Sequence, residues 1–391
     1  ISKKGDDFEI ISSIDSSGRV LMEAIFADRD FPPFDRATMD GIAIQYSAIQ
    51  NPINIIKIEG IAAAGDPQKK LMDPQNAIEI MTGAVLPIGT DTVIRYEDVI
   101  LENQTVQIPE ISFKKGSNIH IQGSDRKKGD LLLEAGRRIS PAEIAILATV
   151  GKSKIKVSPK ISIAIVATGD ELVDISTIPL PHQIRMSNVY SIASILSGWD
   201  AYVETFHLAD DDSLIHKTLA EIFQKFELVV LSGGVSKGKK DYIPTVMNEL
   251  GVKKIFHGVR QRPGKPFWFG KKTSSENVVF ALPGNPVSSF MCTHRYILPW
   301  IRKKLGLNPF SPNFAVLAED FSFAPPLEYF LQVRLKWDHS GILFAYPIEG
   351  KGSGDLANVT EADGFLQLPE QRSFFKKGES YPLFVFRPLF S

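Results

Sequence analysis

The sequence predicts an α/β plus all-β protein of several domains, in which a doubly wound α/β domain is the central part. The chain has 391 residues, which is longer than a single hydrophobic core usually supports. Strand-like and helix-like patterns alternate from residue 160 to residue 306, as they do in parallel α/β sheets. Short strand-like runs separated by turn residues lie on either side of this region. We therefore expect four domains.

Residues 28–129 are expected to form a β-rich domain. Its apolar runs are short and are interrupted by Gly, Pro, Asp and Asn, which is typical of strands joined by turns. These runs are Ile53–Ile58, Ala77–Met81, Thr92–Tyr96 and Thr105–Ile108. Residues 1–27 and 130–159 flank it and are expected to form a discontinuous linking domain. There, Ser140, Pro141 and Glu143 form the pattern of a helix start, because they satisfy or remove the free N–H groups of the first turn.

The α/β domain is expected to span residues 160–306. Four continuous apolar runs predict strands buried on both faces of a parallel sheet: Ile161–Ala167, Ala201–Leu208, Leu228–Leu231 and Val278–Leu282. Helical spacing of apolar residues predicts helices near Asn188–Leu196, Asp212–Phe226, Tyr242–Leu250 and Pro286–Lys304. Residues 307–391 return to strand signals and predict a C-terminal β domain. Its strands are expected at Tyr329–Trp337, Ile342–Tyr346, Gly364–Leu368 and Tyr381–Phe386.

Composition excludes several classes of protein. The formal net charge of -1 gives no overall attraction to nucleic acid, so no nucleic-acid partner is expected. No run approaches 18 apolar residues and the first residues lack the apolar stretch of a signal peptide, so we expect a cytoplasmic protein without membrane association. The single cysteine, Cys292, excludes an intramolecular disulfide and a multi-cysteine metal site. The histidines show no paired spacing typical of zinc sites.

Three glycine-containing loops follow predicted strands of the α/β domain. They are Thr168–Glu171, Ser232–Gly238 and Pro283–Ser288. Loops at the carboxyl ends of parallel strands meet at one crevice, and glycines such as Gly233 and Gly234 let backbone N–H groups approach an anion there. A structural role alone is the alternative for each loop taken singly, but three together predict a ligand site.

Cations and carboxylates accompany these loops in the sequence. Lys237, Lys239 and Lys240 follow the Gly-Gly pair, and residues 260–265 add three cations, which predicts a local oxyanion site. A solvated basic surface is the alternative. Carboxylates near a phosphate site favour Mg²⁺, which binds one or two of them together with phosphate oxygens. The candidates are Asp170, Glu171, the run Asp210–Asp212 and Asp241; helix N-caps are the alternative for Asp211, Asp212 and Asp241.

A loop of the β-rich region also carries polar groups. Residues 31–41 combine prolines with two acids and a hydroxyl, and residues 81–84 add Thr82 beside a glycine. Turn chemistry alone accounts for this composition better than a site does. The chain contains neither a Gly-x-Ser-x-Gly elbow nor a P-loop, which argues against those two kinds of catalytic site.

In order and spacing, these stretches resemble the molybdopterin molybdenumtransferases, the family of MoeA and of the E domain of gephyrin, along nearly the whole chain. Each motif is short, and the resemblance is specific because many motifs occur in the same order. The matching stretches are Pro32–Ala43, Ile80–Ala84, Gly123–Gly129, Val166–Leu172, Ser232–Gly238 with Asp241 and Tyr242, Pro263–Phe267, Leu282–Ser288 and Gly352–Leu356.

The resemblance implies an enzyme of molybdenum cofactor biosynthesis. Such an enzyme accepts adenylylated molybdopterin, hydrolyses the adenylate with Mg²⁺, inserts molybdate at the dithiolene and releases AMP. The resemblance further implies an elongated homodimer whose active cleft lies between the α/β domain of one subunit and domains of the other, with a molybdopterin adenylyltransferase as a candidate partner.

The same resemblance assigns roles to residues by motif position. The implied catalytic residues are Asp40, Thr82, Asp125, Glu171 and Asp241. The implied substrate-binding residues are Gly233, Gly234, Ser236, Lys237, Arg262, Lys265, Pro283, Asn285, Pro286 and Ser288, with Arg262, Lys265 and Ser288 at the molybdate. The acids expected to bind Mg²⁺ are Asp170, Glu171, Asp211 and Asp241.

Four positions depart from the family pattern. Lys237 replaces a residue that is usually apolar, and Arg262 replaces a Lys, which favours bidentate binding of an oxyanion. Ala37 stands where the family usually has Ser, and Gly258 stands where a Lys is common, for which Arg260 is expected to compensate. Two other functions fit part of the sequence. One is a molybdopterin adenylyltransferase, which usually consists of the α/β domain alone, and the other is a non-catalytic scaffold like the gephyrin E domain. The sequence does not separate molybdate from tungstate, because the two oxyanions have nearly the same size and charge.

Overall fold

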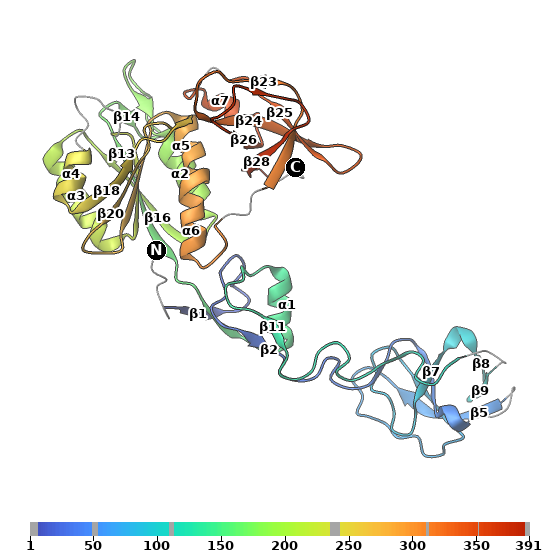
Figure 1. The fold of residues 1–391 in the computed structure, drawn as a ribbon. Helices are drawn as coiled ribbons and strands as arrows, with labels where there is room; N and C mark the ends of the chain where they lie inside the picture. The colour runs from blue at the N-terminus through green and yellow to red at the C-terminus, as the bar shows by residue number, and fades with distance from the viewer. Residues whose placement is uncertain are drawn as a thin grey trace. The chain divides into compact units, whose positions relative to one another are not determined.

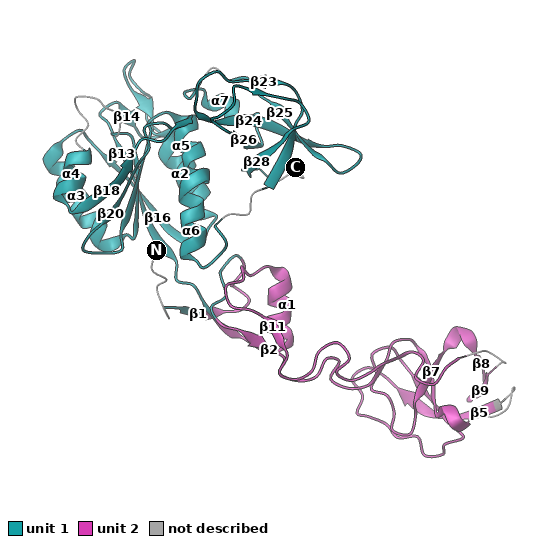
Figure 2. Ribbon diagram, viewed as in Figure 1, with its two compact units in different colours: residues 1–10, 18–22, 156–391 teal, residues 11–17, 23–155 magenta. Residues whose placement is uncertain are grey.

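The computed structural model describes residues 7–48, 54–108, 113–234, 243–309, 313–350 and 352–387. The chain forms two compact units (Figure 2). Unit 1 contains residues 1–10, 18–22 and 156–391, and unit 2 contains residues 11–17 and 23–155. The finer division into four domains remains a prediction. No helix in these described ranges is long and apolar enough to cross a membrane.

The centre of unit 1 is a six-stranded sheet in the order β16-β13-β17-β21-β20-β18. The first four strands are parallel, and β20 and β18 extend the sheet in antiparallel pairing. The sequence predicted the four parallel strands but neither antiparallel one. The bounds are β13 Ile161–Thr168, β16 Ala201–Leu208, β17 Leu228–Ser232, β18 Val252–His257, β20 Trp268–Lys272 and β21 Val278–Leu282.

Burial of these strands matches the prediction in the middle of the sheet and differs at its edge. All residues of β17 and β21, and nearly all of β13, are buried. The prediction that β16 is buried on both faces is wrong, because most of its residues are exposed or half-buried. β16 pairs with β13 alone and is therefore the edge strand of the sheet.

Helices cover both faces of the sheet, which confirms the doubly wound fold (Figure 1). One face packs against α2 (Ser187–Ser197), α5 (Pro286–Cys292) and α6 (Leu298–Lys304). The other packs against α3 (Asp212–Lys225) and α4 (Ile243–Glu249). A π-helical turn, Thr293–Ile297, joins α5 to α6, so the predicted helix over residues 286–304 is one continuous run. The sequence predicted that the helix corresponding to α4 starts at Tyr242, a residue that lies outside the described ones.

The C-terminal part of unit 1 is a small β-barrel. Its strand order is β24-β25-β22-β28-β26, and a further pairing of β26 with β24 closes the ring. Strand β19 (Gln261–Arg262), which comes from the α/β region, pairs with β24. The bounds are β22 Asn313–Leu317, β24 Glu328–Trp337, β25 Leu343–Pro347, β26 Gly364–Leu368 and β28 Ser380–Val385; shorter elements are β14 Leu172–Val173, β15 Ile184–Arg185, β23 Phe321–Ser322, α7 Leu356–Val359 and β27 Phe374–Phe375.

Unit 2 contains a sheet in the order β7-β4-β6-β5-β9-β8 and the helix α1. Helix α1 starts as predicted, with Ser140 and Glu143 forming a capping box and Pro141 in the first turn. The bounds are β2 Ile25–Phe26, β3 Arg36–Ala37, β4 Gly41–Ile44, β5 Asn54–Ala62, β6 Ala77–Ile80, β7 Thr92–Arg95, β8 Ile100–Glu102, β9 Thr105–Ile108, β10 Ile119–His120, β11 Leu131–Leu133 and α1 Pro141–Thr149. Strands β1 (Glu9–Ser12) and β12 (Lys154–Val157) form a separate two-stranded sheet.

Candidate active site

A crevice lies at the carboxyl ends of β13, β17 and β21, where the sequence predicted one. The parallel register places Ala167 beside Ser232, and Ser232 beside Leu282, so the three following loops start at the same edge of the sheet. They enclose a cavity of about 290 Å³. Its lining includes Thr168, Glu171, Ser187, Asn188, Ser232, Gly233, Gly284, Pro286 and Gly354. Most of these groups are small or polar, so backbone groups are accessible to a ligand.

The backbone conformation after β17 favours glycine at both positions of the Gly-Gly pair. Gly233 and Gly234 both have positive φ, at 100° and 67°. A Cβ on Gly234 would lie 2.7 Å from Cγ1 of Ile243 and 3.0 Å from Oγ1 of Thr168. The chain therefore passes between a helix residue and a strand residue with no room for a side chain, which keeps backbone groups at the crevice wall.

Asn188 is a polar residue of the crevice that the sequence analysis missed. Its Nδ2 donates to Oγ of Ser232 at 3.2 Å and to the carbonyl of Gly284 at 2.8 Å. One amide thus ties the start of α2 to two of the three strand-end loops. Its place in the first turn of a predicted helix was the available signal, but nothing in the sequence showed that this turn faces the same edge.

The acids predicted to bind Mg²⁺ differ in the hydrogen bonds that their carboxylates already accept. Glu171 lines the crevice, and its carboxylate lies against Gly169. Oδ1 of the exposed Asp170 accepts from the backbone N–H of Asp210 at 3.1 Å. Asp211 is the N-cap of α3, and its Oδ1 accepts from the backbone N–H of Leu214 at 2.8 Å. This cap is the alternative that the sequence left open for Asp211.

A second cavity, of about 260 Å³, contains the predicted oxyanion residue Arg262. Tyr329, Gln332 and Ser353 also line it, so the barrel supplies most of its polar wall. A loop of the barrel, residues 352–354, borders both cavities. It is attached to the α/β region because Asn285 Nδ2 donates to Oγ of Ser353 at 2.9 Å, and the backbone N–H of Val287 donates to the Ser353 carbonyl at 3.2 Å.

A buried polar network holds the loop that carries Arg262. Gln261 is 1% exposed, and its side chain accepts from the hydroxyl of Tyr296 and donates to the carbonyl of Pro263 at 3.0 Å. A Cβ on Gly264 would lie 2.6 Å from Sγ of Cys292. Cys292 is buried, as its place in the sequence predicted, and burial raises the pKa of its thiol. The cysteine is therefore a packing residue beneath this loop.

The other predicted substrate residues are placed less favourably. Lys265 is exposed and lines neither cavity, and Ser288 is 2% exposed. Pro283, the first residue of its loop, is buried. Arg260, expected to compensate for Gly258, lines neither cavity, and its Nε pairs with Glu370 at 3.0 Å. The predicted residues Ser236, Lys237 and Asp241 lie outside the described residues.

Asp40 and Thr82 form a hydrogen-bonded pair in unit 2. One carboxylate oxygen, Oδ1 of Asp40, accepts from the Thr82 backbone N–H at 2.6 Å and from its hydroxyl at 2.7 Å. These two bonds hold the pKa of the exposed Asp40 carboxyl below its usual range. The sequence predicted both residues from the family resemblance, while composition alone favoured turn chemistry. The pair is consistent with an ionised, oriented carboxylate.

Asp125 belongs to a second polar group of unit 2. His120 Nε2 lies 2.8 Å from Oδ1 of Asp125, and Nδ1 of the same ring lies 3.4 Å from Nη2 of Arg36. Since a guanidinium only donates, this network assigns Nδ1 as the acceptor and Nε2 as the donor to Asp125. The sequence analysis did not single out His120 or Arg36. β3 and β10 bring them together through the pairing of Arg36 with His120.

Ala37, the departure from the family's Ser, is buried in the core of unit 2. It is 2% exposed and packs in an apolar cluster with Ala43, Ile80 and Val93. The position is therefore an apolar packing site in this chain.

This arrangement defines the class of the protein. It is a multidomain α/β protein with a ligand crevice at the strand ends of its parallel sheet, partly walled by a C-terminal β-barrel. Residues 164–303 match a family described as a probable molybdopterin binding domain. Residues 4–151 match the MoeA N-terminal region (domain I and II), and residues 315–386 match the MoeA C-terminal region (domain IV).

Individual relatives agree with these matches. A molybdopterin molybdenumtransferase of Synechocystis sp. is 40% identical over 372 residues, covering 95% of this chain and 93% of the relative. One of Staphylococcus epidermidis is 32% identical, covering 93% and 88%. A molybdopterin biosynthesis MoeA protein of Pyrococcus horikoshii has a solved structure with a TM-score of 0.81 at 30% identity, covering 98% and 95%. The chain belongs to the molybdopterin molybdenumtransferase (MoeA) family and is an enzyme of molybdenum cofactor biosynthesis.

Proposed function

We propose that this enzyme inserts molybdate into adenylylated molybdopterin, with Mg²⁺-dependent hydrolysis of the adenylate and release of AMP. The observation that carries the proposal is the crevice at the ends of β13, β17 and β21, in a domain that matches the molybdopterin-binding family. Such crevices bind phosphorylated ligands through backbone N–H groups and small side chains. In this chain Gly233, Ser232 and Asn188 would bind pterin or adenylate phosphate there.

The acids beside the crevice fit Mg²⁺ in a limited way. The described part of the chain holds no group of three Asp, Glu, His or Cys side chains that could bind a metal ion. Mg²⁺ needs only one or two carboxylates when phosphate oxygens complete its shell. Glu171 and the adjacent Asp170 meet that requirement. The ion would neutralise negative charge on the phosphoanhydride. Asp211 is the weaker candidate because it already caps α3.

The cavity beside Arg262 supports an oxyanion site. Arg262 is the cation on its wall, and Gln332 and Ser353 are polar side chains of the same lining. A guanidinium binds oxyanions through two N–H groups at once, which suits a dianion such as molybdate. The loop of residues 352–354 borders both this cavity and the crevice. Molybdate would therefore bind on one side of this loop and adenylylated molybdopterin on the other.

Asp40, Thr82 and Asp125 would contribute to turnover from unit 2. The ionised Asp40, fixed by Thr82, has the properties of a group that orients water or substrate. His120 would orient Asp125 in the same manner. We further propose, from the family resemblance, that the enzyme is a cytoplasmic homodimer. Sedimentation equilibrium of the full chain tests whether it is a dimer.

The decisive experiment incubates the purified protein with adenylylated molybdopterin, Mg²⁺ and molybdate, and measures AMP. We expect AMP release that requires both Mg²⁺ and molybdate. AMP release without any effect of molybdate would contradict the proposal. Formation of adenylylated pterin from ATP and molybdopterin would instead assign the adenylyltransferase step, and a folded protein without turnover would leave the scaffold function.

A further inference from the structure

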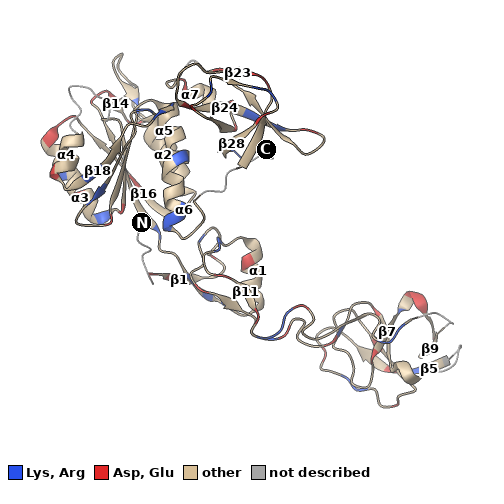
Figure 3. Ribbon diagram, in the orientation of Figure 1, with Lys and Arg blue, Asp and Glu red and all other residues tan. Residues whose placement is uncertain are grey.

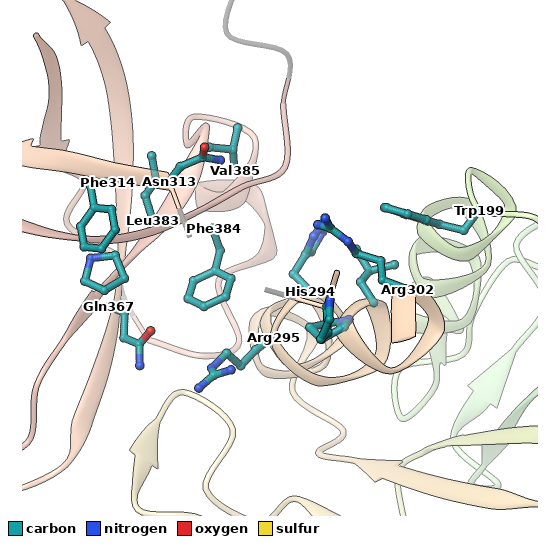
Figure 4. A pocket seen from close by; sticks show the side chains of 14 residues that line it. Trp199, His294, Arg295, Arg302, Asn313, Phe314, Gln367, Leu383, Phe384 and Val385 are labelled. Atoms are coloured by element: carbon teal, nitrogen blue, oxygen red, sulfur yellow. The ribbon is translucent and has the colours of Figure 1, made fainter. Parts of the chain in front are cut away.

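A third cavity of unit 1, of about 330 Å³, lies between the helical run α5–α6 and the C-terminal barrel (Figure 4). We call it the Arg302 pocket. It shares no lining residue with the crevice or with the Arg262 cavity. Arg295 and Arg302 come from the helical run, Phe314 and Phe384 from β22 and β28, and Trp199 from the turn after α2. Its volume is within the range of small-molecule sites.

The charge of the Arg302 pocket is positive. None of the described residues that line it is Asp or Glu, while two are arginines. The helical run over residues 286–304 itself contains no acid, and Figure 3 shows its basic positions. Burial lowers the pKa of the lining residue His294 to about 4, so its ring is neutral at pH 7. The positive charge therefore comes from the two guanidinium groups.

The side chain of Arg302 packs against Trp199, and its positive charge is not neutralised by an acidic side chain of the described residues. Its guanidinium carbon lies 5.7 Å from the centre of the Trp199 ring. No carboxylate in the described ranges of the chain forms an ion pair with it. Its Nε, like Nε2 of His294, is buried and has no hydrogen-bond partner among the described residues. A cation that is partly removed from water and not paired favours a bound anion, because an anion recovers the lost solvation.

The rest of the lining is apolar and aromatic. Figure 4 shows Phe384 and Phe314 on the barrel side, opposite the arginines, with Trp199 beside Arg302. The guanidinium carbon of Arg295 lies 5.4 Å from the centre of the Phe384 ring. An inorganic anion would leave these rings uncovered, and a neutral apolar molecule would further desolvate the arginines. Both parts of the wall are satisfied by a molecule that has an anionic group and an apolar body.

We propose that the Arg302 pocket binds a small organic anion. Its carboxylate, sulfonate or phosphate group would accept hydrogen bonds from Arg302 and Arg295. Its aromatic or branched aliphatic body would pack against Trp199 and Phe384. Because the wall is formed by both the α/β region and the barrel, bound ligand stabilises their association, and the melting temperature rises with ligand concentration.

The test uses 8-anilinonaphthalene-1-sulfonate, an aromatic sulfonate that fluoresces in apolar sites, with the full chain. Arg302→Gln should weaken binding at least tenfold. Lys303→Gln, an equal charge change at the exposed neighbouring position on α6, should leave binding within twofold. Benzoate and phenyl phosphate should displace the probe, whereas benzamide and inorganic phosphate should not. Arg302→Lys keeps the charge and should bind with intermediate affinity.

Three outcomes would overturn the proposal. The first is equal probe affinity in wild type, Arg302→Gln and Arg302→Lys, all with cooperative unfolding. The second is equal displacement by benzamide and benzoate, which would make the site merely apolar. The third is probe binding that falls as the protein concentration rises and the chain self-associates, which would assign the pocket to a contact between two copies of the chain.

Discussion

The crevice of unit 1 and the acidic groups of unit 2 are built in opposite ways. The crevice is lined mainly by strand ends, glycines and small side chains, with Glu171 and Arg185 as its charged residues, and its shape is imposed by the buried strands β13, β17 and β21. Asp40 and Asp125 are exposed carboxylates, each oriented by a hydrogen-bonding neighbour. Under the proposed function, unit 1 supplies the shape of the binding sites and the charged residues Glu171 and Arg262, whereas unit 2 supplies two oriented carboxylates. Variants that change one property at a time test this separation.

The largest effect is expected from Asp40→Asn, which removes the charge but keeps the shape. If unit 2 supplies charge for the reaction, kcat for molybdate-dependent AMP release should fall about 10²–10³-fold with little change in KM. Glu102→Gln, at an exposed acid of the same unit, is the control and should retain wild-type rates. A raised KM at unchanged kcat would make Asp40 a binding group and remove the distinction.

The second test compares two glycines of the strand-end loops. Gly234→Ala places a Cβ 2.7 Å from Cγ1 of Ile243 at positive φ, and we expect a loss of about 1–3 kcal/mol of unfolding free energy. Gly284→Ala meets no atom within 4 Å and should change stability by less than about 0.5 kcal/mol. Its added methyl should still raise KM for adenylylated molybdopterin. Denaturant unfolding and steady-state kinetics measure both, and equal stability of the two variants would contradict the described geometry.

A smaller effect is expected from Thr82→Val, which removes the hydroxyl bond to Asp40 and keeps the backbone bond. Because that bond favours the ionised carboxylate, its loss should raise the pKa of Asp40, and activity should decline at a higher pH on the acid side. At neutral pH we expect about a 3–30-fold lower kcat from poorer orientation. Thr82→Ser should restore both values. NMR titration of the Asp40 carboxyl carbon reports the pKa, and an unchanged value would rule out this role of Thr82.

The smallest effect separates the two roles of Asp211. As an N-cap of α3, Asp211→Ala should cost about 1 kcal/mol of stability, and Asp211→Ser should retain the cap. Both variants should keep the wild-type dependence of AMP release on Mg²⁺ concentration. A shift of that dependence in Asp211→Ser, at unchanged stability, would show that the carboxylate binds the ion.

Sequence patterns predicted the α/β domain well because its signals are local. Continuous apolar runs predicted β13, β17 and β21, and the Ser140 capping box predicted the start of α1. The same approach failed for β16, because this strand contains Glu204, Thr205 and His207 and is less apolar than the central strands, as an edge strand exposed to water can be. It also missed β18 and β20, whose polar residues depart from the apolar pattern of the central strands.

The sequence could suggest site residues only where they belong to a recognisable motif. The three strand-end loops met at one crevice because parallel strands place their carboxyl ends at one edge, a rule that needs no coordinates. Ser288 and Lys265 belong to equally clear motifs, yet one is buried and the other lines neither cavity. A motif names residues near a site, while burial and direction depend on packing against distant segments.

For this protein, the sequence alone determined the order of its elements, the strand-end crevice and the family. Only the tertiary structure decided which side chains act together: Asn188 with Ser232, His120 with Asp125, and Arg302 with Trp199. These partners are between 5 and 103 positions apart along the chain, and none is related by a strand or helix period. The two distant contacts arise because sheet register and helix packing bring separate segments to one place, and the contact of His120 with Asp125 depends on the path of the turn between them.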